Sequence, residues 1–377
     1  MSDSPSARNT DAHARTERPR AVVYCEANFG AIDGKTANGL VRNSERYEIV
    51  SIVDSQLAGR DAGMVLDGVD NGIPICRDLD DAMTQSDLVP DMFIVGVAPT
   101  SGLLSTVERG VLLDAMSRGL NLVNGLHEFL TDDPEFAAAA AINAVEITDV
   151  RRPRAKVDLR MFTGRILDVE CPRIAVLGTD GAIGKRTTAT ILTKALNDHG
   201  VKAVLVGTGQ TSLIQGARHG TALDAVPAQF VTGELEAAVI DAFEAESPDV
   251  IVVEGQGALS HPTYLSSTAV LRGSRPAAVI LQHAPARTTI SDFPAFPMPT
   301  PASEINLIET FADTTVIGLT INHENMTDSE VTAAITLYEL ELGIPATDAL
   351  SRPTDRLLDM VFAKFPDLKE CAPIAAT

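Results

Sequence analysis

Short apolar runs alternate with longer stretches of mixed polarity along most of the chain. In the first half, stretches of helical character separate these runs, and the first lies near residues 36–43. Apolar strands alternating with helices are typical of a parallel, doubly wound sheet. We therefore expect an α/β fold with a Rossmann-like N-terminal domain over residues 21–150. Its strands are predicted at residues 21–25 (AVVYC), 49–54 (IVSIVD), 92–98 (MFIVGVA) and 120–125 (LNLVNG).

A second series of apolar runs begins at residue 173, and each run is continuous, as expected when helices cover both faces of a sheet. We expect residues 173–377 to form a second doubly wound parallel sheet. Residues 1–20 are predicted to be a disordered head, and 151–172, with three close arginines, a connection. The proline-rich stretch 294–301 (PAFPMPTP) is predicted to be a rigid surface loop, neither strand nor helix interior. The strands are predicted at 173–178 (RIAVLG), 201–209 (VKAVLVGTG), 248–257 (PDVIVVEGQG), 276–284 (PAAVILQHA) and 314–322 (TTVIGLTIN).

The segment GTDGAIGKRTT, residues 178–188, follows the first of these strands and opens a helix. A phosphate-binding loop needs glycines for its backbone path, converging N–H groups, a lysine and a helix N-terminus behind it. The segment meets these needs, so it makes the second domain P-loop NTPase-like. We expect the cofactor-binding residues to be Gly178, Thr179, Asp180, Gly181, Gly184, Lys185, Arg186, Thr187 and Thr188.

The loop departs from the standard pattern G-x-x-x-x-G-K-[ST] in two ways. Five residues separate Gly178 from Gly184, and Arg186 stands where the magnesium-binding hydroxyl is expected. Hydrolysis of a nucleoside triphosphate uses that hydroxyl to hold Mg²⁺, whereas a cofactor that is only held by its phosphates needs no metal. The extra guanidinium would neutralise a pyrophosphate or 3′-phosphate, so coenzyme A and ATP are both open at this point. The sequence itself requires no metal.

Several polar residues follow the predicted strands of the second domain. Ligands bind at the carboxyl ends of strands in open α/β sheets, where we expect Gln210, Glu254 and His283. Glu254 is either a general base, a carboxylate that orients the ligand, or a strand-end cap. The dense polar stretch after residue 207 and the end of the fourth strand add Arg218, Asp224 and Arg287 as candidates.

The first domain carries FGAIDGKT, residues 29–36, after its first strand. Gly34, Lys35 and Thr36 form either an anion site or a plain helix cap. Asp54 ends the second strand, where a nicotinamide-binding fold keeps its ribose acid, but the preceding G-x-G-x-x-G is missing. This disfavours a dehydrogenase.

The composition limits the partners. The net charge of -21 leaves no basic face for nucleic acid, and no apolar run reaches the roughly 18 residues of a membrane span. The first 20 residues lack the apolar region of a secretory signal. We therefore expect a cytoplasmic protein with small-molecule substrates, and a homo-oligomer. The cysteines have no CxxC spacing and are predicted to be reduced, without disulfide or zinc: Cys25, Cys76, Cys171 and Cys371.

Five phrases together resemble a two-domain P-loop family that contains the D-glutamate N-acetyltransferases: GTDGAIGKRTT, GTGQTSLIQGARHG, DAVPAQFVTGELE, VVEGQGALSHP and LQHAPART. FGAIDGKTANGLVR in the first domain fits the same family, so the resemblance covers nearly all of the chain after about residue 20. It implies transfer of an acetyl group from acetyl-CoA to the amino group of D-glutamate. GTD is also similar to dethiobiotin synthetase, whose loop holds ATP, but Arg186 departs from that enzyme.

The implied reaction assigns roles to the candidates. The loop would hold acetyl-CoA as co-substrate, and arginines would grip the two carboxylates of glutamate. Loop N–H groups near Gly255 or Gly257 would stabilise the oxyanion. A covalent route through Cys25 is conceivable, but we expect direct attack. The alternatives are an ATP- or GTP-dependent ligase or kinase acting on a small acidic metabolite, and a non-catalytic nucleotide sensor. The predicted bases are Glu254, Asp224 and His283, and the predicted substrate-binding residues are Gln210, Arg218, Arg287 and Lys35.

Overall fold

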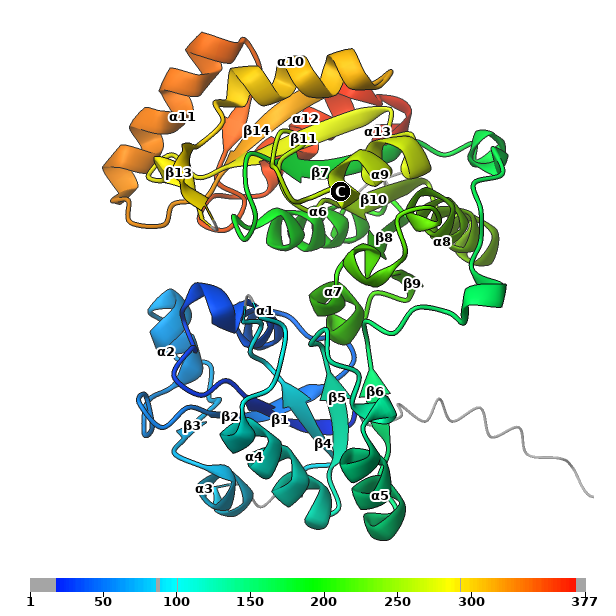
Figure 1. Cartoon of the computed structure of the whole chain (residues 1–377). Helices are drawn as coiled ribbons and strands as arrows, with labels where there is room; N and C mark the ends of the chain where they lie inside the picture. The colour runs from blue at the N-terminus through cyan, green and yellow to red at the C-terminus, as the bar shows by residue number, and fades with distance from the viewer. Residues whose placement is uncertain (1–17, 86–88, 100, 292, 371–377) are drawn as a thin grey trace, which may run out of the picture.

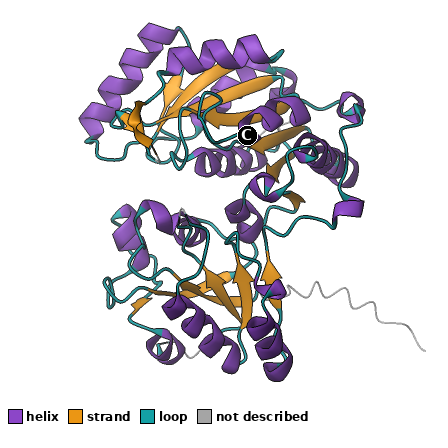
Figure 2. Ribbon diagram, in the orientation of Figure 1, coloured by secondary structure: helices purple, strands orange, loops and turns teal. Residues whose placement is uncertain are grey.

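The computed structural model describes residues 18–85, 89–99, 101–291 and 293–370. The predicted head, up to residue 17, and Cys371 lie outside these residues. The chain forms two α/β domains, one after the other, with the N-terminal domain below and the C-terminal domain above in Figure 1. Helices flank each sheet (Figure 2). None of the described helices is long and apolar enough to cross a membrane.

The N-terminal sheet has the strand order β3-β2-β1-β4-β5-β6, and all of its pairs are parallel. This is the order of a dinucleotide-binding Rossmann sheet, which confirms the predicted Rossmann-like fold. The strands are β1 (Arg20–Tyr24), β2 (Glu48–Val53), β3 (Ile75–Cys76), β4 (Met92–Val95), β5 (Asn121–Asn124) and β6 (Ile147–Asp149), and the helices are α1 (Lys35–Arg42), α2 (Ala62–Asp67), α3 (Leu79–Thr84), α4 (Thr106–Ser117) and α5 (Pro134–Asn143).

The C-terminal sheet is also parallel, in the order β15-β14-β11-β7-β10-β8-β9. β10 and β11 are buried along their whole length, as their continuous apolar runs predict. The strands are β7 (Arg173–Gly178), β8 (Ala203–Gly207), β9 (His219–Gly220), β10 (Val250–Glu254), β11 (Ala278–His283), β14 (Val316–Ile321) and β15 (Ala346–Thr347). The helices are α6 (Lys185–Asp198), α7 (Gln210–Gln215), α8 (Val231–Glu246), α9 (Ser266–Ser274), α10 (Pro301–Phe311), α11 (Asp328–Leu342), α12 (Asp355–Lys364) and α13 (Asp367–Glu370).

The prediction of a loop at the proline-rich stretch 294–301 is partly wrong. β13 (Phe293–Pro297) pairs with β12 (Thr289–Ile290) in a two-stranded antiparallel ribbon. A ribbon strand needs few backbone donors on its open edge, so proline is tolerated there. Residues 294–297 are exposed, which agrees with the predicted surface position.

The short helix α7 belongs to the C-terminal domain but packs on the N-terminal one. Ile214 is fully buried within the N-terminal hydrophobic core. Gln215 Nε2 donates to the carbonyl oxygens of Gly39 at 2.7 Å and Asn43 at 2.6 Å. Direct apolar and hydrogen-bonded contact therefore joins the two domains at this helix.

Candidate functional site

A cleft of about 1040 Å³ lies between the domains, and both domains contribute to its walls. Its floor is the carboxyl edge of the C-terminal sheet, where ligands bind in open α/β folds. The N-terminal wall includes the loop before α1, the first residues of α1 and the turn after β5. The lining segments are residues 30–33, 125–127, 181–188, 209–211, 254–256, 321–324 and 348–350.

The phosphate loop connects β7 to α6 and forms part of this floor. Gly184 takes a left-handed φ of 101°, which a side chain would strain, and the helix begins at the next residue. The Lys185 ammonium donates to the carbonyl oxygen of Asp180. Burial lowers the pKa of Lys185 to about 7, against the attraction of Asp180 and Glu254. The loop thus holds a desolvated lysine at a helix N-terminus, the arrangement that favours an anion.

The nine predicted loop residues divide into two groups. Gly181, Gly184 and the residues from 185 to 188 line the cleft. Gly178, Thr179 and Asp180 lie beneath them and do not line it. Thr179 and Asp180 are buried and hold the loop to its surroundings.

Arg287 braces the loop from one side. Its guanidinium donates to Asp180 Oδ2 at 3.1 Å and to the carbonyl oxygens of Gly181 and Ala182, both at 3.1 Å. Two further bonds reach the carboxylate of Glu324, one of them 2.9 Å long. Arg287 therefore lines the cleft, as predicted for a substrate-binding residue, while its guanidinium pairs with two protein carboxylates and shapes the phosphate loop.

His283 does not line the cleft. Its ring is buried, with Nδ1 2.8 Å from the Thr179 hydroxyl and an edge-on contact to Tyr338. Burial lowers its pKa to about 4. This position does not favour the predicted role as a base, because a base must reach the reacting proton.

Arg186 points toward the N-terminal domain. Its guanidinium, at the rim of the cleft, donates to Gln215 Oε1. It also lies against α1, where a Cβ added to Gly39 would come within 2.4 Å of Nη1. Burial lowers the pKa of this guanidinium. Arg186 therefore connects the phosphate loop to the domain junction.

Glu254 ends β10 and lines the cleft beside the loop. Its Oε2 accepts from the backbone N–H groups of Thr208 at 2.9 Å and Gly209 at 3.2 Å, and from the Ser212 hydroxyl at 2.8 Å. Burial raises its pKa. Oε1 accepts no hydrogen bond from the described residues.

Asp224 lines the cleft but is held in an ion pair across the domain junction. It accepts from the guanidinium of Arg151, which lies in the predicted connection and also donates to the Gly125 carbonyl oxygen at 2.7 Å. The carboxylate of Asp224 is thus engaged by an arginine of the domain junction. The structure therefore favours a docking role over the predicted role as a base.

The predicted substrate-binding residues are only partly brought together. Gln210 and Lys35 line the cleft from opposite domains. Arg218 does not: its side chain is 79% exposed and pairs with Glu246 at 3.4 Å. Arg218 precedes the edge strand β9, which directs it outward. Arg218 therefore lies apart from the other predicted substrate-binding residues.

Two candidates of the N-terminal domain are buried. Cys25 is inaccessible to solvent, and burial raises the pKa of its thiol. Asp54 Oδ2 accepts from the backbone N–H of Phe29 at 3.0 Å, and Oδ1 accepts from that of Gln56 at 3.0 Å. Asp54 therefore holds a backbone loop, and Cys25 lies outside the cleft.

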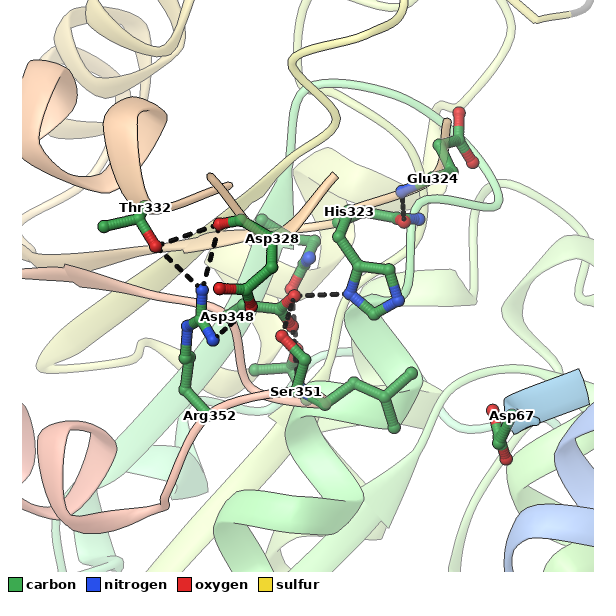
Figure 3. A network of polar contacts seen from close by, with 12 residues as sticks. Asp67, His323, Glu324, Asp328, Thr332, Asp348, Ser351 and Arg352 are labelled. Atoms are coloured by element: carbon green, nitrogen blue, oxygen red, sulfur yellow. Dashed lines mark hydrogen bonds and ion pairs between the residues drawn. The ribbon is translucent and has the colours of Figure 1, made fainter. Parts of the chain in front are cut away.

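The sequence predictions missed a histidine and aspartate pair on the same edge of the sheet. His323 comes directly after the predicted strand ending at residue 322, and its Nδ1 contacts the buried Asp348 after β15 (Figure 3). The strand end before His323 was a usable signal, since ligands bind there. The two-residue strand before Asp348 is too short to give such a signal in the sequence.

Comparison with known proteins agrees with this architecture. Residues 55–153 match the DUF1611_N domain, described as Rossmann-like, and residues 160–358 match the DUF1611_C P-loop domain, both described as domains of unknown function. A crystal structure of a DUF1611 family protein from Anabaena variabilis superposes with a TM-score of 0.84 at 30% identity, covering 92% of this chain and 100% of that one.

Two relatives bear a name that describes an activity. A D-glutamate N-acetyltransferase of Tritonibacter scottomollicae is 31% identical over 277 residues, 72% of this chain and 80% of the relative. A second protein of that name, from Pseudoalteromonas, is 29% identical over 273 residues, 71% of this chain and 80% of the relative. The resemblance seen in the motifs is confirmed, and the chain belongs to the DUF1611 family of two-domain proteins with a Rossmann-like and a P-loop domain.

Proposed function

We propose that the cleft transfers the acetyl group of acetyl-CoA to the amino group of D-glutamate. The observation that carries this proposal is the phosphate loop on the floor of a cleft shared by both domains. The chain matches two proteins named for this reaction over 72% and 71% of its length. A cleft of this kind can take a phosphate-bearing cofactor and a small amino acid together.

Coenzyme A carries a pyrophosphate and a ribose phosphate, and the loop has the groups to receive one of them. The N–H groups at the start of α6 point out of the helix end, and Lys185 supplies charge. Burial lowers the pKa of Lys185 to about 7, and the negative charge of a bound phosphate would favour the charged ammonium. We therefore assign Lys185 and the N-terminus of α6 to the phosphates of the acetyl donor.

The loop favours this use over metal-dependent phosphoryl transfer. Arg186 occupies the position of the metal-binding hydroxyl and is bonded to Gln215. The hydroxyl of Thr188 donates to Gln282 Oε1 at 2.6 Å, so it serves the loop's own structure. A ligase or kinase acting through Mg²⁺ therefore remains the less favoured alternative.

The amino-acid substrate needs cationic or amide donors for its two carboxylates. Lys35 at the start of α1 and Gln210 at the start of α7 reach the cleft from the two domains. Gly255 lines the cleft beyond Glu254 and could offer its N–H to the oxyanion, whereas Gly257 does not line it. We assign Glu254 to orienting the loop after β8 and the helix α7, since its carboxylate accepts two hydrogen bonds from that loop and one from that helix.

Thiol release from acetyl-CoA tests the proposal. The purified protein is assayed with D-glutamate and L-glutamate in parallel, and the free thiol is measured over time. We expect release that depends on both acetyl-CoA and D-glutamate and exceeds that with L-glutamate. No release with either amino acid would contradict the proposal.

Thermal unfolding separates the proposal from the nucleotide-dependent alternative. A ligand present at 100 times its Kd stabilises the folded state by about 2.7 kcal/mol. We expect acetyl-CoA to raise the melting temperature and ATP with magnesium to leave it nearly unchanged. Stabilisation by ATP with magnesium alone would favour the ligase or kinase.

A further inference from the structure

We infer that His323, held by the buried Asp348, is the general base that deprotonates the amino group of the amino-acid substrate in the cleft. The inference rests on the proposed acetyl transfer and names a catalytic residue for it. Both residues line the cleft at the carboxyl edge of the C-terminal sheet. His323 would contact the substrate nitrogen, and Asp348 would be a positioning residue.

The two side chains come from neighbouring strands. β14 and β15 are parallel, with Thr320 paired to Thr347, so the residues after both strands meet at one edge. His323 Nδ1 lies in hydrogen-bond contact with Asp348 Oδ2 (Figure 3). The His323 side chain is 38% exposed, whereas that of Asp348 is 1% exposed. The buried acid thus anchors a ring that remains open to the cleft.

This contact determines what the ring can do. An ionised carboxylate accepts the Nδ1 proton, which leaves Nε2 of the neutral imidazole as a proton acceptor. Nε2 has no hydrogen-bond partner among the described residues. In Figure 3 the ring edge opposite Asp348 turns toward the side where Asp67 of the N-terminal domain is drawn. The acceptor nitrogen is therefore available to a substrate between the domains.

The aspartate is held rigidly. Its carboxylate also accepts from the Ser351 hydroxyl at 2.7 Å and from the backbone N–H of Leu350 at 2.9 Å. The guanidinium of Arg352 donates to Asp328 at 2.5 Å and to the Thr332 hydroxyl at 3.0 Å, which ties the same loop to the first turn of α11. A fixed acid keeps the imidazole in one orientation, as a catalytic base requires.

The residues on either side of His323 are bonded to the phosphate-loop assembly. Asn322 Nδ2 donates to the Ile183 carbonyl oxygen at 3.1 Å. Glu324 accepts from Arg287, which in turn donates to the loop carbonyl groups. The base and the loop therefore share one rigid frame, so a cofactor held by the loop has a defined position relative to His323.

His323 and Glu254 end strands on opposite sides of β7. β14 lies two strands from β7 on one side, and β10 lies next to β7 on the other. The two residues therefore face the phosphate loop from its two flanks.

The proton and bond changes balance as follows. The substrate ammonium loses one proton to Nε2 of His323, which passes it to solvent at the open edge of the cleft. The free amine attacks the thioester carbonyl carbon, forming the C–N bond, and its second proton goes to Nε2. The C–S bond then breaks, and the leaving thiolate takes that proton from the imidazolium. The products are the N-acetyl amino acid, the free thiol and one proton.

Replacement of the histidine tests the inference. In H323Q, steady-state thiol release with acetyl-CoA and D-glutamate should show kcat reduced by roughly 10²- to 10⁴-fold, with both KM values little changed. H323A should regain part of its rate when imidazole is added, which a structural defect would not allow. D348N should also lower kcat without raising either KM, because an amide can hold the ring in the wrong tautomer.

The matched control is H199Q, at an exposed histidine that ends α6 outside the cleft. H199Q should keep the wild-type rate, and the melting temperatures of all variants should confirm folding. H323Q activity within tenfold of wild type, or a slow H323A that imidazole does not accelerate, would overturn the inference while leaving the proposed function intact. A wild-type protein without thiol release would overturn the proposed function and, with it, the inference.

Discussion

The two flanks of the phosphate loop use the same sheet edge in different ways. On one flank, Glu254 accepts two hydrogen bonds from the segment that leads into α7 and one from α7 itself, and α7 packs on the N-terminal domain. On the other flank, His323 and Asp348 form a pair with an open ring edge. On the first flank, three protein contacts hold Oε2 of Glu254 and only Oε1 is left unbonded among the described residues; on the second flank, the half-exposed ring of His323 keeps Nε2 as an acceptor.

This difference indicates a division of tasks. α7 contributes Ser212 to the carboxylate of Glu254, and Thr211 to a 2.9 Å hydroxyl contact with Thr36 of the other domain. On the Glu254 flank, α7 therefore connects the carboxyl edge of the sheet to the domain junction. The His323 flank, braced by Arg287 and Glu324, is the place where a proton can move.

Of the following predictions, the largest effect is expected from replacing the lysine of the phosphate loop, which lies between the two flanks. In K185M, the KM for acetyl-CoA should rise by about 10- to 100-fold, because a charge-assisted hydrogen bond to a phosphate is worth roughly 1.5–3 kcal/mol. The KM for D-glutamate should change much less. The matched control is K194M on the exposed face of α6, where Lys194 pairs with Asp198 at 2.5 Å. A larger rise for D-glutamate would place the loop at the wrong substrate.

The pH dependence of acetyl-CoA binding tests the same contact between Lys185 and the phosphates. Burial lowers the pKa of Lys185 to about 7, with Asp180 and Glu254 opposing the shift and Arg287 and Lys35 adding to it. A bound phosphate favours the charged ammonium, so binding above pH 7 must take up a proton. The affinity for acetyl-CoA should therefore fall between pH 7 and pH 9, by at most about tenfold per pH unit.

Calorimetric titration over that range measures the effect, where the 3′-phosphate is already a dianion because its second pKa is about 6. K185M should bind weakly with no such slope. A wild-type affinity that is constant with pH would show that the lysine does not meet the phosphates.

At the domain junction on the Glu254 flank, we predict a smaller effect, which concerns the stability of the protein. In G39A, the added Cβ would push the Arg186 guanidinium away from Gln215. Loss of this hydrogen bond should lower the free energy of unfolding by about 1 kcal/mol. G110A is the matched control, since Gly110 lies in α4 with open space around its Cβ. Helix propensity alone should make G110A more stable by up to about 1 kcal/mol. Urea unfolding should show no such gain for G39A, and equal gains would contradict the docking role.

Much of the fold could be predicted because it depends on local patterns. The run RIAVLG forms β7 over the predicted residues, and the glycines after it form the loop. Two-residue strands such as β15 carry no periodic signal, so the position of Asp348 beside His323 could not be foreseen. The prolines of β13 obscured a strand that forms only by pairing with its neighbour.

The site was harder to predict than the fold, because the sequence shows which polar residues exist but not which are already bonded. Arg287, Asp224 and His283 were reasonable candidates by residue type, and each is engaged by a partner far away in the chain. Glu254 was correctly placed at the carboxyl edge. The strand end before His323 was a signal in the sequence, but the pairing of β14 and β15 that places Asp348 beside His323 could not be predicted.

Product analysis tests the central claim most directly. The wild-type protein is incubated with acetyl-CoA and D-glutamate without nucleotide or added metal, and free thiol and N-acetylglutamate are both quantified by mass spectrometry. We predict that the two products appear in equal amounts, at a rate proportional to protein concentration. Absence of N-acetylglutamate, or its formation only when ATP is added, would contradict acetyl transfer in this cleft.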